Sequence, residues 1–144
     1  ADVAINYKER DFSEAVREAA ADGVDVILDI SGGEYLARNV SLLKRKGRLV
    51  ILALLGGALA EINLGFLLRS RLRVMGSVLR SRSLEEKVAI KDGFEKRFWP
   101  LLLDGRIQTV IDTVLPVEQV ADAQDILTNN QNIGKVILTV RNET

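Results

Sequence analysis

Two short and almost uninterrupted apolar runs set the tightest limit on how this chain can fold. They are VDVILDI at 24–30 and RLVILAL at 48–54. An apolar run of this length is typical of a strand buried on both faces of a parallel sheet. Amphipathic stretches separate the runs, so the first 57 residues alternate between strand and helix. The sequence therefore predicts an α/β fold with a doubly wound parallel sheet.

The same periodicity continues to the end of the chain and gives a full set of expected elements. The expected strands are Val3–Tyr7, Val24–Ile30, Arg48–Leu54, Leu72–Leu79, Thr109–Leu115 and Val136–Val140. The expected helices are Asp11–Ala21, Glu34–Lys46, Asn63–Arg71, Ser83–Leu103 and Glu118–Thr128. Asn63 is the predicted N-cap of the third helix, because its side chain can accept a hydrogen bond from a free backbone N–H of the first turn.

Composition excludes several classes of protein. Lys plus Arg number 20 and Asp plus Glu number 20, so the net charge is zero and a nucleic-acid partner is not expected. The chain has no Cys and no His, the main ligands of zinc, so no metal site is expected within it. The longest apolar run, 49–60, falls short of the roughly 20 residues of a membrane span. No signal peptide is recognised, and we expect a cytoplasmic protein without a membrane partner.

Glycine-rich turns follow both apolar strands, as SGG at 31–33 and LGG at 55–57. Ligands of open α/β sheets bind beyond the carboxyl ends of the strands, where these turns lie. Two interpretations stay open: the glycines make tight turns, or they let the backbone approach a flat ligand closely. The chain contains neither G-x-G-x-x-G nor G-x-x-x-x-G-K-[ST], so neither turn is a phosphate loop.

A series of motifs carries a resemblance to a known family. The motifs are DVAINYKERDFSEAV, GVDVILDISGGEYLARNVSLLKRKGRLVIL, LLGGALAEINLGFLL, VMGSVLRSRSLEEK and LPVEQVADAQDILTNNQNIGKVILTV. Together they resemble the NADPH-dependent quinone oxidoreductases, the zinc-free, zeta-crystallin-like branch of the medium-chain dehydrogenase/reductases. The resemblance covers essentially the whole chain and places it in the C-terminal part of that family's sequence.

The resemblance implies a fold and a function. Residues 1–103 correspond to a partial Rossmann domain without its first β-α-β unit, which holds the phosphate loop in the family. Residues 104–144 correspond to strands and a helix that return to the family's catalytic domain. The implied reaction is hydride transfer from NADPH to a quinone, an enone or a related conjugated carbonyl. The isolated chain is expected to be inactive, and no residue in it is assigned a catalytic role.

The resemblance also implies which residues touch the cofactor. They are Tyr7, Ser31, Gly32, Ala53, Leu54, Leu55, Val78, Leu79, Arg80, Asn132, Gly134 and Lys135. Tyr7 would lie against the 2′-phosphate end, 31–32 against the adenosine ribose, 53–55 over the nicotinamide ribose and 78–80 at the carboxamide. The segment 132–135 would fold back on the cofactor, where a lysine suits phosphate as a mobile point charge. Asp29 is expected to be structural, and Arg82 to belong to a solvated charge cluster.

The strand Leu72–Leu79 carries a prediction about assembly. Its side chains are apolar on both faces, and an open apolar edge invites pairing with another chain. Members of the resembled family dimerise through this region, so we expect a homodimer through this strand. The alternative function is a non-catalytic α/β module for binding or dimerisation.

Overall fold

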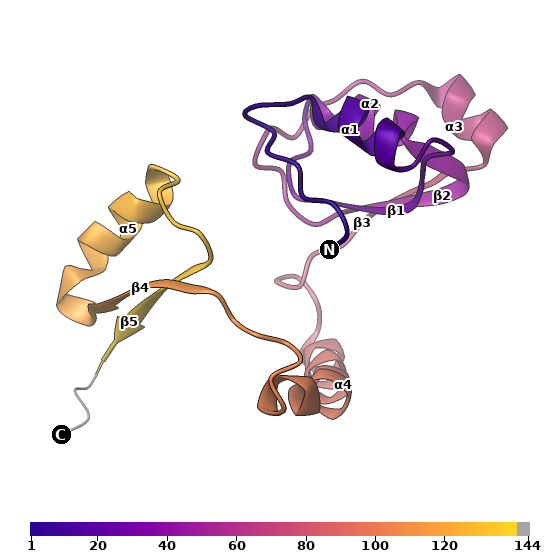
Figure 1. Cartoon of the computed structure of the whole chain (residues 1–144). Helices are drawn as coiled ribbons and strands as arrows, with labels where there is room; N and C mark the ends of the chain where they lie inside the picture. The colour runs from indigo at the N-terminus through magenta and orange to yellow at the C-terminus, as the bar shows by residue number, and fades with distance from the viewer. Residues whose placement is uncertain (141–144) are drawn as a thin grey trace. The chain divides into compact units, whose positions relative to one another are not determined.

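The computed structural model describes residues 1–140 and divides the chain into two compact units (Figure 1). The first unit is Ala1–Ser83 and the second is Leu84–Thr144, of which the last four residues lie outside the described part. The predicted assignment of 1–103 to the cofactor domain and 104–144 to the catalytic domain stays a prediction.

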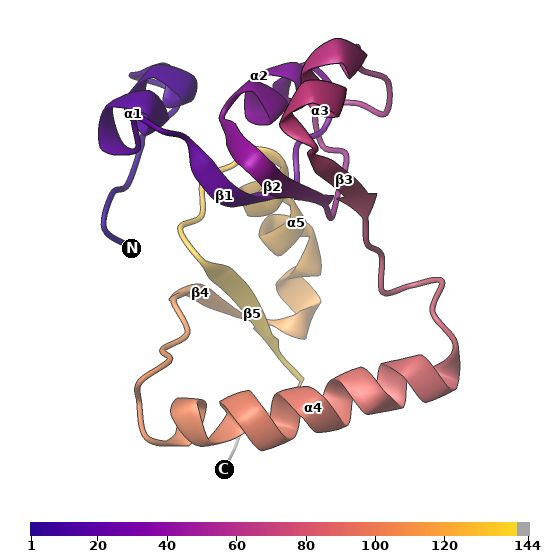
Figure 2. The ribbon, with the colours of Figure 1, turned by 90° about the vertical axis from the view of Figure 1, so that its right-hand side faces the viewer.

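A three-stranded parallel sheet forms the centre of the first unit. Its strands are β1 (Val24–Asp29), β2 (Leu43–Ile51) and β3 (Arg73–Gly76), in the spatial order β1-β2-β3. Its helices are α1 (Phe12–Ala19), α2 (Tyr35–Ser41) and α3 (Leu64–Ser70). All three helices lie on the same side of the strands (Figures 1 and 2). The predicted α/β fold with parallel strands is confirmed.

The core lies between the sheet and these helices. Leu49, in the middle of β2, is completely buried and packs with Val40, Leu43 and Leu72. Because side chains alternate along a strand, the neighbours of Leu49 face the other way. On that opposite face Leu28, Val50 and Met75 are partners in register across the three strands, and Leu28 is 67% exposed. The helices of the first unit thus cover one face of the sheet.

Side-chain caps begin two of the helices in the first unit. The Asp11 carboxylate accepts hydrogen bonds from the backbone N–H groups of Ser13 and Glu14 at the start of α1. The Asn63 side chain accepts one from Phe66 N–H at 2.9 Å, which confirms the predicted cap of α3. These caps occupy backbone donors that the helix itself leaves free.

Two predictions for the first unit are wrong: one strand does not form, and one helix ends earlier than expected. Residues 3–7 form no strand, since no described strand pairs with them and Val3 and Tyr7 are exposed. The helix predicted to reach Lys46 ends at Ser41, and β2 begins at Leu43. Leu43 is buried, and it reaches the core from a strand paired with Val24 of β1. Tertiary pairing here overrides a helical pattern in the sequence.

The strand predicted at Leu72–Leu79 is shorter than expected, since β3 covers Arg73–Gly76. It pairs with β2 alone and is an edge of the sheet, as predicted. The residues after Gly76 leave the sheet, so the free edge is four residues long.

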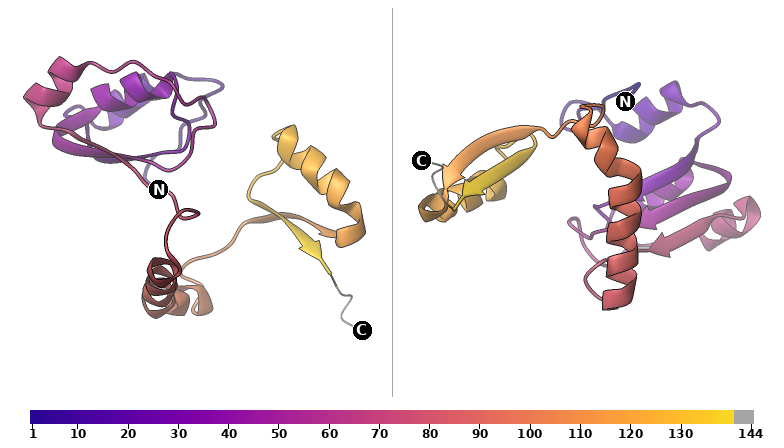
Figure 3. Two further views of the ribbon diagram at one scale, coloured as in Figure 1. Left: turned by 180° about the vertical axis from the view of Figure 1, so that it is seen from behind. Right: turned by 90° about the horizontal axis from the view of Figure 1, so that it is seen from below.

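The second unit contains a helix followed by a parallel β-α-β arrangement (Figure 3). The helix is α4 (Leu84–Leu103), and β4 (Ile111–Pro116) pairs in parallel with β5 (Lys135–Thr139). A short 3₁₀ turn (Val117–Gln119) and α5 (Val120–Thr128) connect these two strands. Ala123 of α5 is buried, whereas no residue of α4 is.

Candidate cofactor site

The turns that follow β1 and β2 are joined by backbone hydrogen bonds. Gly56 N–H donates to Ser31 O at 2.7 Å, and Leu55 N–H donates to Ile30 O at 3.2 Å. Leu52 N–H donates to Asp29 O at 2.7 Å, which continues the ladder beyond the strands. The structure therefore brings Ser31 and Leu55, two predicted site residues, together at the carboxyl edge of the sheet.

Glycine is required where these two turns meet. Gly32 and Gly33 have φ angles of 62° and 50°, a region that favours glycine. A Cβ atom on Gly33 would lie 2.2 Å from Gly56 O, and one on Gly32 would lie 2.7 Å from Leu54 Cδ2. Protein atoms occupy the space that a side chain would need. At this point the structure favours the interpretation that glycine makes the turn.

Asp29 ends β1 beneath the same turn and is only 3% exposed. Its Oδ1 accepts hydrogen bonds from Ser31 N–H at 2.7 Å and Gly32 N–H at 3.0 Å. Its Oδ2 is buried without a protein partner among the described residues. The carboxylate fixes the turn that carries Ser31 and Gly32, which agrees with the structural role predicted for it.

An apolar groove of about 430 Å³ opens at the carboxyl ends of β2 and β3. Its lining residues are Ile51, Leu52, Ala53, Leu54, Gly76, Ser77 and Val78. Ala53, Leu54 and Val78 are predicted site residues, and the structure places all three in one groove. The sequence analysis did not single out the other lining residues, Ile51, Leu52, Gly76 and Ser77. The expectation that two parallel strands end side by side could have indicated them.

Two details define the chemistry of this groove. Ser77 N–H donates to Ile51 O at 2.9 Å, which fixes the distance between its two walls. No atom lies within 4 Å of a Cβ built on Gly76, so the groove is open at that point. Aliphatic walls with few polar groups suit the flat ring of a ligand rather than its phosphates.

Leu79 and Arg80, the remaining predicted residues near this edge, are exposed and do not line the groove. Leu79 accepts a hydrogen bond from Arg82 N–H at 3.2 Å within a turn. The guanidinium of Arg82 lies 3.5 Å from the Ser77 hydroxyl at the groove. Arg82, expected to be solvated, thus approaches the site more closely than predicted.

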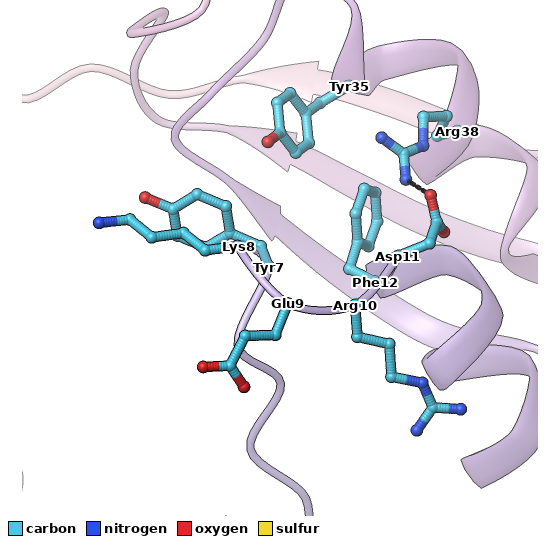
Figure 4. Close-up of a pocket in the computed structure, with 8 residues that line it drawn as sticks. All are labelled: Tyr7, Lys8, Glu9, Arg10, Asp11, Phe12, Tyr35 and Arg38. Atoms are coloured by element: carbon cyan, nitrogen blue, oxygen red, sulfur yellow. Dashed lines mark hydrogen bonds and ion pairs between the residues drawn. The ribbon is translucent and has the colours of Figure 1, made fainter.

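A second opening, of about 330 Å³, surrounds Tyr7 (Figure 4). Its lining residues are Tyr7, Lys8, Glu9, Arg10, Asp11, Phe12, Tyr35 and Arg38. Tyr7 is 60% exposed, so one face of its ring is available to a ligand. The sequence singled out only Tyr7 here, because the other aromatic rings come from α1 and α2.

An arginine and two rings join α1 to α2 on one side of this opening. The rings of Phe12 and Tyr35 are stacked 5.4 Å apart, and the guanidinium of Arg38 lies 4.3 Å from the centre of the Phe12 ring. Arg38 also forms an ion pair with Asp11. The Ser13 hydroxyl and the Glu14 N–H, followed by Arg38, hold the pKa of Asp11 below its usual value.

The cations that line the Tyr7 opening differ in whether a carboxylate pairs with them. Arg38 is paired with Asp11, and Arg10 is paired with Glu18. Lys8 forms no ion pair with any residue of 1–140. An anionic ligand at Tyr7 would therefore find its available positive charge on Lys8.

The last three predicted site residues lie in the second unit. Gly134 has a φ of 102°, and a Cβ there would lie 2.4 Å from Val110 O. Lys135 N–H donates to the same carbonyl at 2.9 Å, and the Asn132 amide donates to Gly134 O at 2.8 Å. The side chain of Lys135 is exposed at the start of β5. The contact of this segment with a cofactor stays a prediction.

Residues 1–140 contain no group of three or more Asp, Glu, His or Cys side chains placed to hold a metal ion. Within the same range no helix combines the length and the apolarity needed to span a bilayer.

Comparison with known proteins agrees with the fold. A family model described as a zinc-binding dehydrogenase matches residues 1–138. The chain belongs to the zinc-binding dehydrogenase family. The chain is 28% identical over 138 residues to the quinone oxidoreductase-like protein 2 of Bos taurus, covering 95% of the chain and 39% of that protein. It is 31% identical over 150 residues to the human synaptic vesicle membrane protein VAT-1 homolog, covering 93% of the chain and 38% of that protein.

Solved structures of the same type include the Escherichia coli quinone oxidoreductase complexed with NADPH. The TM-score is 0.74 with 26% identity, covering 93% of this chain and 42% of that one. The resemblance to quinone oxidoreductases predicted from the sequence is confirmed. The chain spans about two fifths of the length of these relatives.

Proposed function

We propose that this chain is the nicotinamide-binding part of an oxidoreductase that transfers hydride from NADPH to a quinone or a related conjugated carbonyl. The observation that carries the proposal is the apolar groove at the carboxyl ends of β2 and β3. Its place agrees with the general position of ligands in open α/β sheets. The NADPH complex of the similar E. coli quinone oxidoreductase supports the choice of cofactor.

The groove residues would hold and orient the nicotinamide end. Bound NADPH supplies the hydride, and the protein contributes position and a dry surface. Leu52 and Leu54 form an aliphatic wall that keeps water from one face of the ring, while Ala53 presents its backbone. Ser77 offers the nearest hydroxyl for a polar substituent. In this proposal Leu55, Leu79 and Arg80 border the groove, and Ser31 and Gly32 meet the adenosine ribose.

The opening around Tyr7 would take the adenosine 2′-phosphate. The exposed ring of Tyr7 offers a surface for stacking, and Lys8 offers a positive charge that no acidic residue of 1–140 neutralises. Asn132, Gly134 and Lys135 would add a second set of phosphate contacts. Independence of zinc also belongs to the proposal, on the strength of the resemblance and of the lack of Cys and His. A cytoplasmic location and the absence of a nucleic-acid partner belong to it too, the latter because the net charge is zero.

The groove is tested with a matched pair of glycine substitutions. Gly76 and Gly93 both have open space around a built Cβ, but only Gly76 lines the groove. Gly76→Leu should weaken NADPH binding about tenfold or more, since it fills the slot, whereas Gly93→Leu should leave binding unchanged. Binding is measured by the change in nicotinamide fluorescence. Equal affinity of the Gly76→Leu protein and the parent would rule out this groove as the nicotinamide site.

A dimerisation module is the second candidate function. It is favoured by the free edge of β3, which pairs only with β2, and by the exposed Met75 within that strand. A two-fold, antiparallel pairing of β3 with a second copy would close into a dimer. The mass of the protein in solution, measured by light scattering, distinguishes a dimer from a monomer.

A further inference from the structure

Five exposed cations gather where β2 and β3 begin. This group, the basic edge, consists of Arg45, Lys46, Arg48, Arg71 and Arg73. None of the five forms an ion pair or a side-chain hydrogen bond with another residue of the first unit, 1–83. The neighbouring Lys44, in contrast, is paired with Asp25 at 3.5 Å. A chain with zero net charge thus concentrates unneutralised positive charge in one place.

Two of these arginines are direct neighbours in the sheet. Arg48 and Arg73 are register partners on β2 and β3, whose spacing is about 4.7–4.9 Å in a sheet. Leu49 and Val74 face the helices, so Arg48 and Arg73 both point to the opposite face. Like charges directly opposite each other destabilise a sheet. An anion bound between the two side chains would remove this cost.

Unusual backbone conformations hold two further members of the basic edge. Between the register pairs Val24–Leu43 and Val26–Arg48, the residues of β2 depart from regular pairing. Lys46 lies in this irregular segment of β2 and has a φ of 67°. Arg71, the C-cap of α3, has a φ of 53°. Left-handed backbone is rare for residues other than glycine, asparagine and aspartate. Strained non-glycine residues cluster at functional sites, so a function for these cations is worth testing.

The basic edge is separate from the proposed cofactor site. The apolar groove lies at the carboxyl ends of β2 and β3, around Ile51 and Gly76, whereas the basic edge lies at the beginning of the same strands. Hydride transfer at the groove makes no use of charges at the other end of the sheet.

We propose that the basic edge binds an acidic segment of a partner protein, with carboxylates at helical spacing. An arginine fork matches a carboxylate through two parallel hydrogen bonds, and four of the five cations are arginines. Carboxylates three or four residues apart on a helix are about 5–6 Å apart, close to the spacing of Arg48 and Arg73.

The proposal is tested with an alanine-based helical peptide that carries a glutamate at every fourth position and a fluorescent label. Binding of this peptide to the protein is measured by fluorescence anisotropy at low and at physiological ionic strength. Binding should weaken as salt rises, since exposed charges are screened over about 8 Å at physiological ionic strength. The same peptide with lysine in place of glutamate should not bind.

Charge removal locates the binding surface. The Arg48→Gln/Arg73→Gln protein should bind the glutamate peptide about tenfold more weakly. The Lys96→Gln/Arg97→Gln protein loses the same charge on exposed positions of α4 and should bind as the parent does. Lys46→Gly removes one charge and relieves a positive φ, so it should fold at least as well and still bind several-fold more weakly.

Several outcomes would overturn the proposal. They are no binding of the glutamate peptide, an equal loss in the α4 control, and unchanged binding by both the Lys46→Gly and the Arg48→Gln/Arg73→Gln proteins. Tighter binding to a labelled DNA duplex, or to vesicles containing phosphatidylserine, would assign the basic edge to another class of partner.

Discussion

Gly33→Ala tests the close contact between the turns after β1 and β2. Gly33 has a φ of 50°, and a Cβ atom there would lie 2.2 Å from Gly56 O and 2.7 Å from Gly56 C. Both neighbours are backbone atoms, so no flexible side chain can move out of the way. The substitution must therefore push the two turns apart.

The expected cost follows from two separate effects. A residue with a Cβ in left-handed backbone costs about 1–2 kcal/mol relative to glycine. Overpacking at a tight contact adds about 1–3 kcal/mol. The stability of the first unit should therefore fall by about 2–5 kcal/mol. In hydrogen exchange, this loss increases the equilibrium constant for opening of a protected amide about thirtyfold or more.

Hydrogen exchange of single amides is the suitable assay, since it reports on the first unit alone. The protons to follow are Leu52 N–H, bonded to Asp29 O, and Gly56 N–H, bonded to Ser31 O. Gly105→Ala in the second unit is the control for the backbone conformation alone, because Gly105 has a φ of 76° but no atom within 4 Å of its built Cβ; its effect is read from Ile107 N–H, which is bonded to Leu101 O. A Gly33→Ala protein no less stable than the parent, or destabilised no more than the Gly105→Ala control, would refute the argument.

Four further predictions concern the caps, the cofactor and the sheet edge. Asn63→Ala should cost about 0.5–2 kcal/mol in thermal unfolding, because α3 loses its N-cap. The pKa of Asp11 is lower in the folded state than its unfolded value of 3.8, so the Asp11 carboxylate stabilises the fold above pH 3.8. This stabilisation is lost as the pH falls through the folded-state pKa, so the stability of the Asp11→Asn protein should lack this part of the acid dependence, as acid unfolding would measure. Tyr7→Ala and Lys135→Ala should each weaken NADPH binding more than NADH binding in fluorescence titrations, by about 1–3 kcal/mol for Lys135 and by less for Tyr7. Val74→Pro should convert a dimer to a monomer in light scattering, since it removes a backbone donor of β3.

Strands β1 and β2 could be predicted because runs of consecutive apolar residues are typical of strands in a parallel sheet. VDVILDI contains the whole of β1, and RLVILAL contains the last four residues of β2. The beginning of β2 could not be located in this way. Leu43 continues the helical spacing of Leu36 and Val40, and only its pairing with Val24 of β1 makes it part of a strand.

The groove and the Tyr7 opening differ in how far the sequence predicts them. Ala53, Leu54 and Val78 follow apolar strands directly, so their meeting at one edge follows from parallel topology. The cluster of Phe12, Tyr35 and Arg38 depends on how α1 packs beside α2. No spacing along the chain encodes that contact, so Tyr7 was singled out without its neighbours.

The order β1-β2-β3 has a consequence for the route by which the first unit folds. Every strand pair in it is parallel, so no hairpin is available to start the sheet, and each pairing must first close a loop of roughly 20–25 residues. Such non-local pairing slows folding relative to helical proteins of the same size. Because β2 is the partner of both other strands, neither ladder can form before it is extended. The middle strand is thus the template on which the sheet is assembled, and changes within it should slow folding more than changes at either edge.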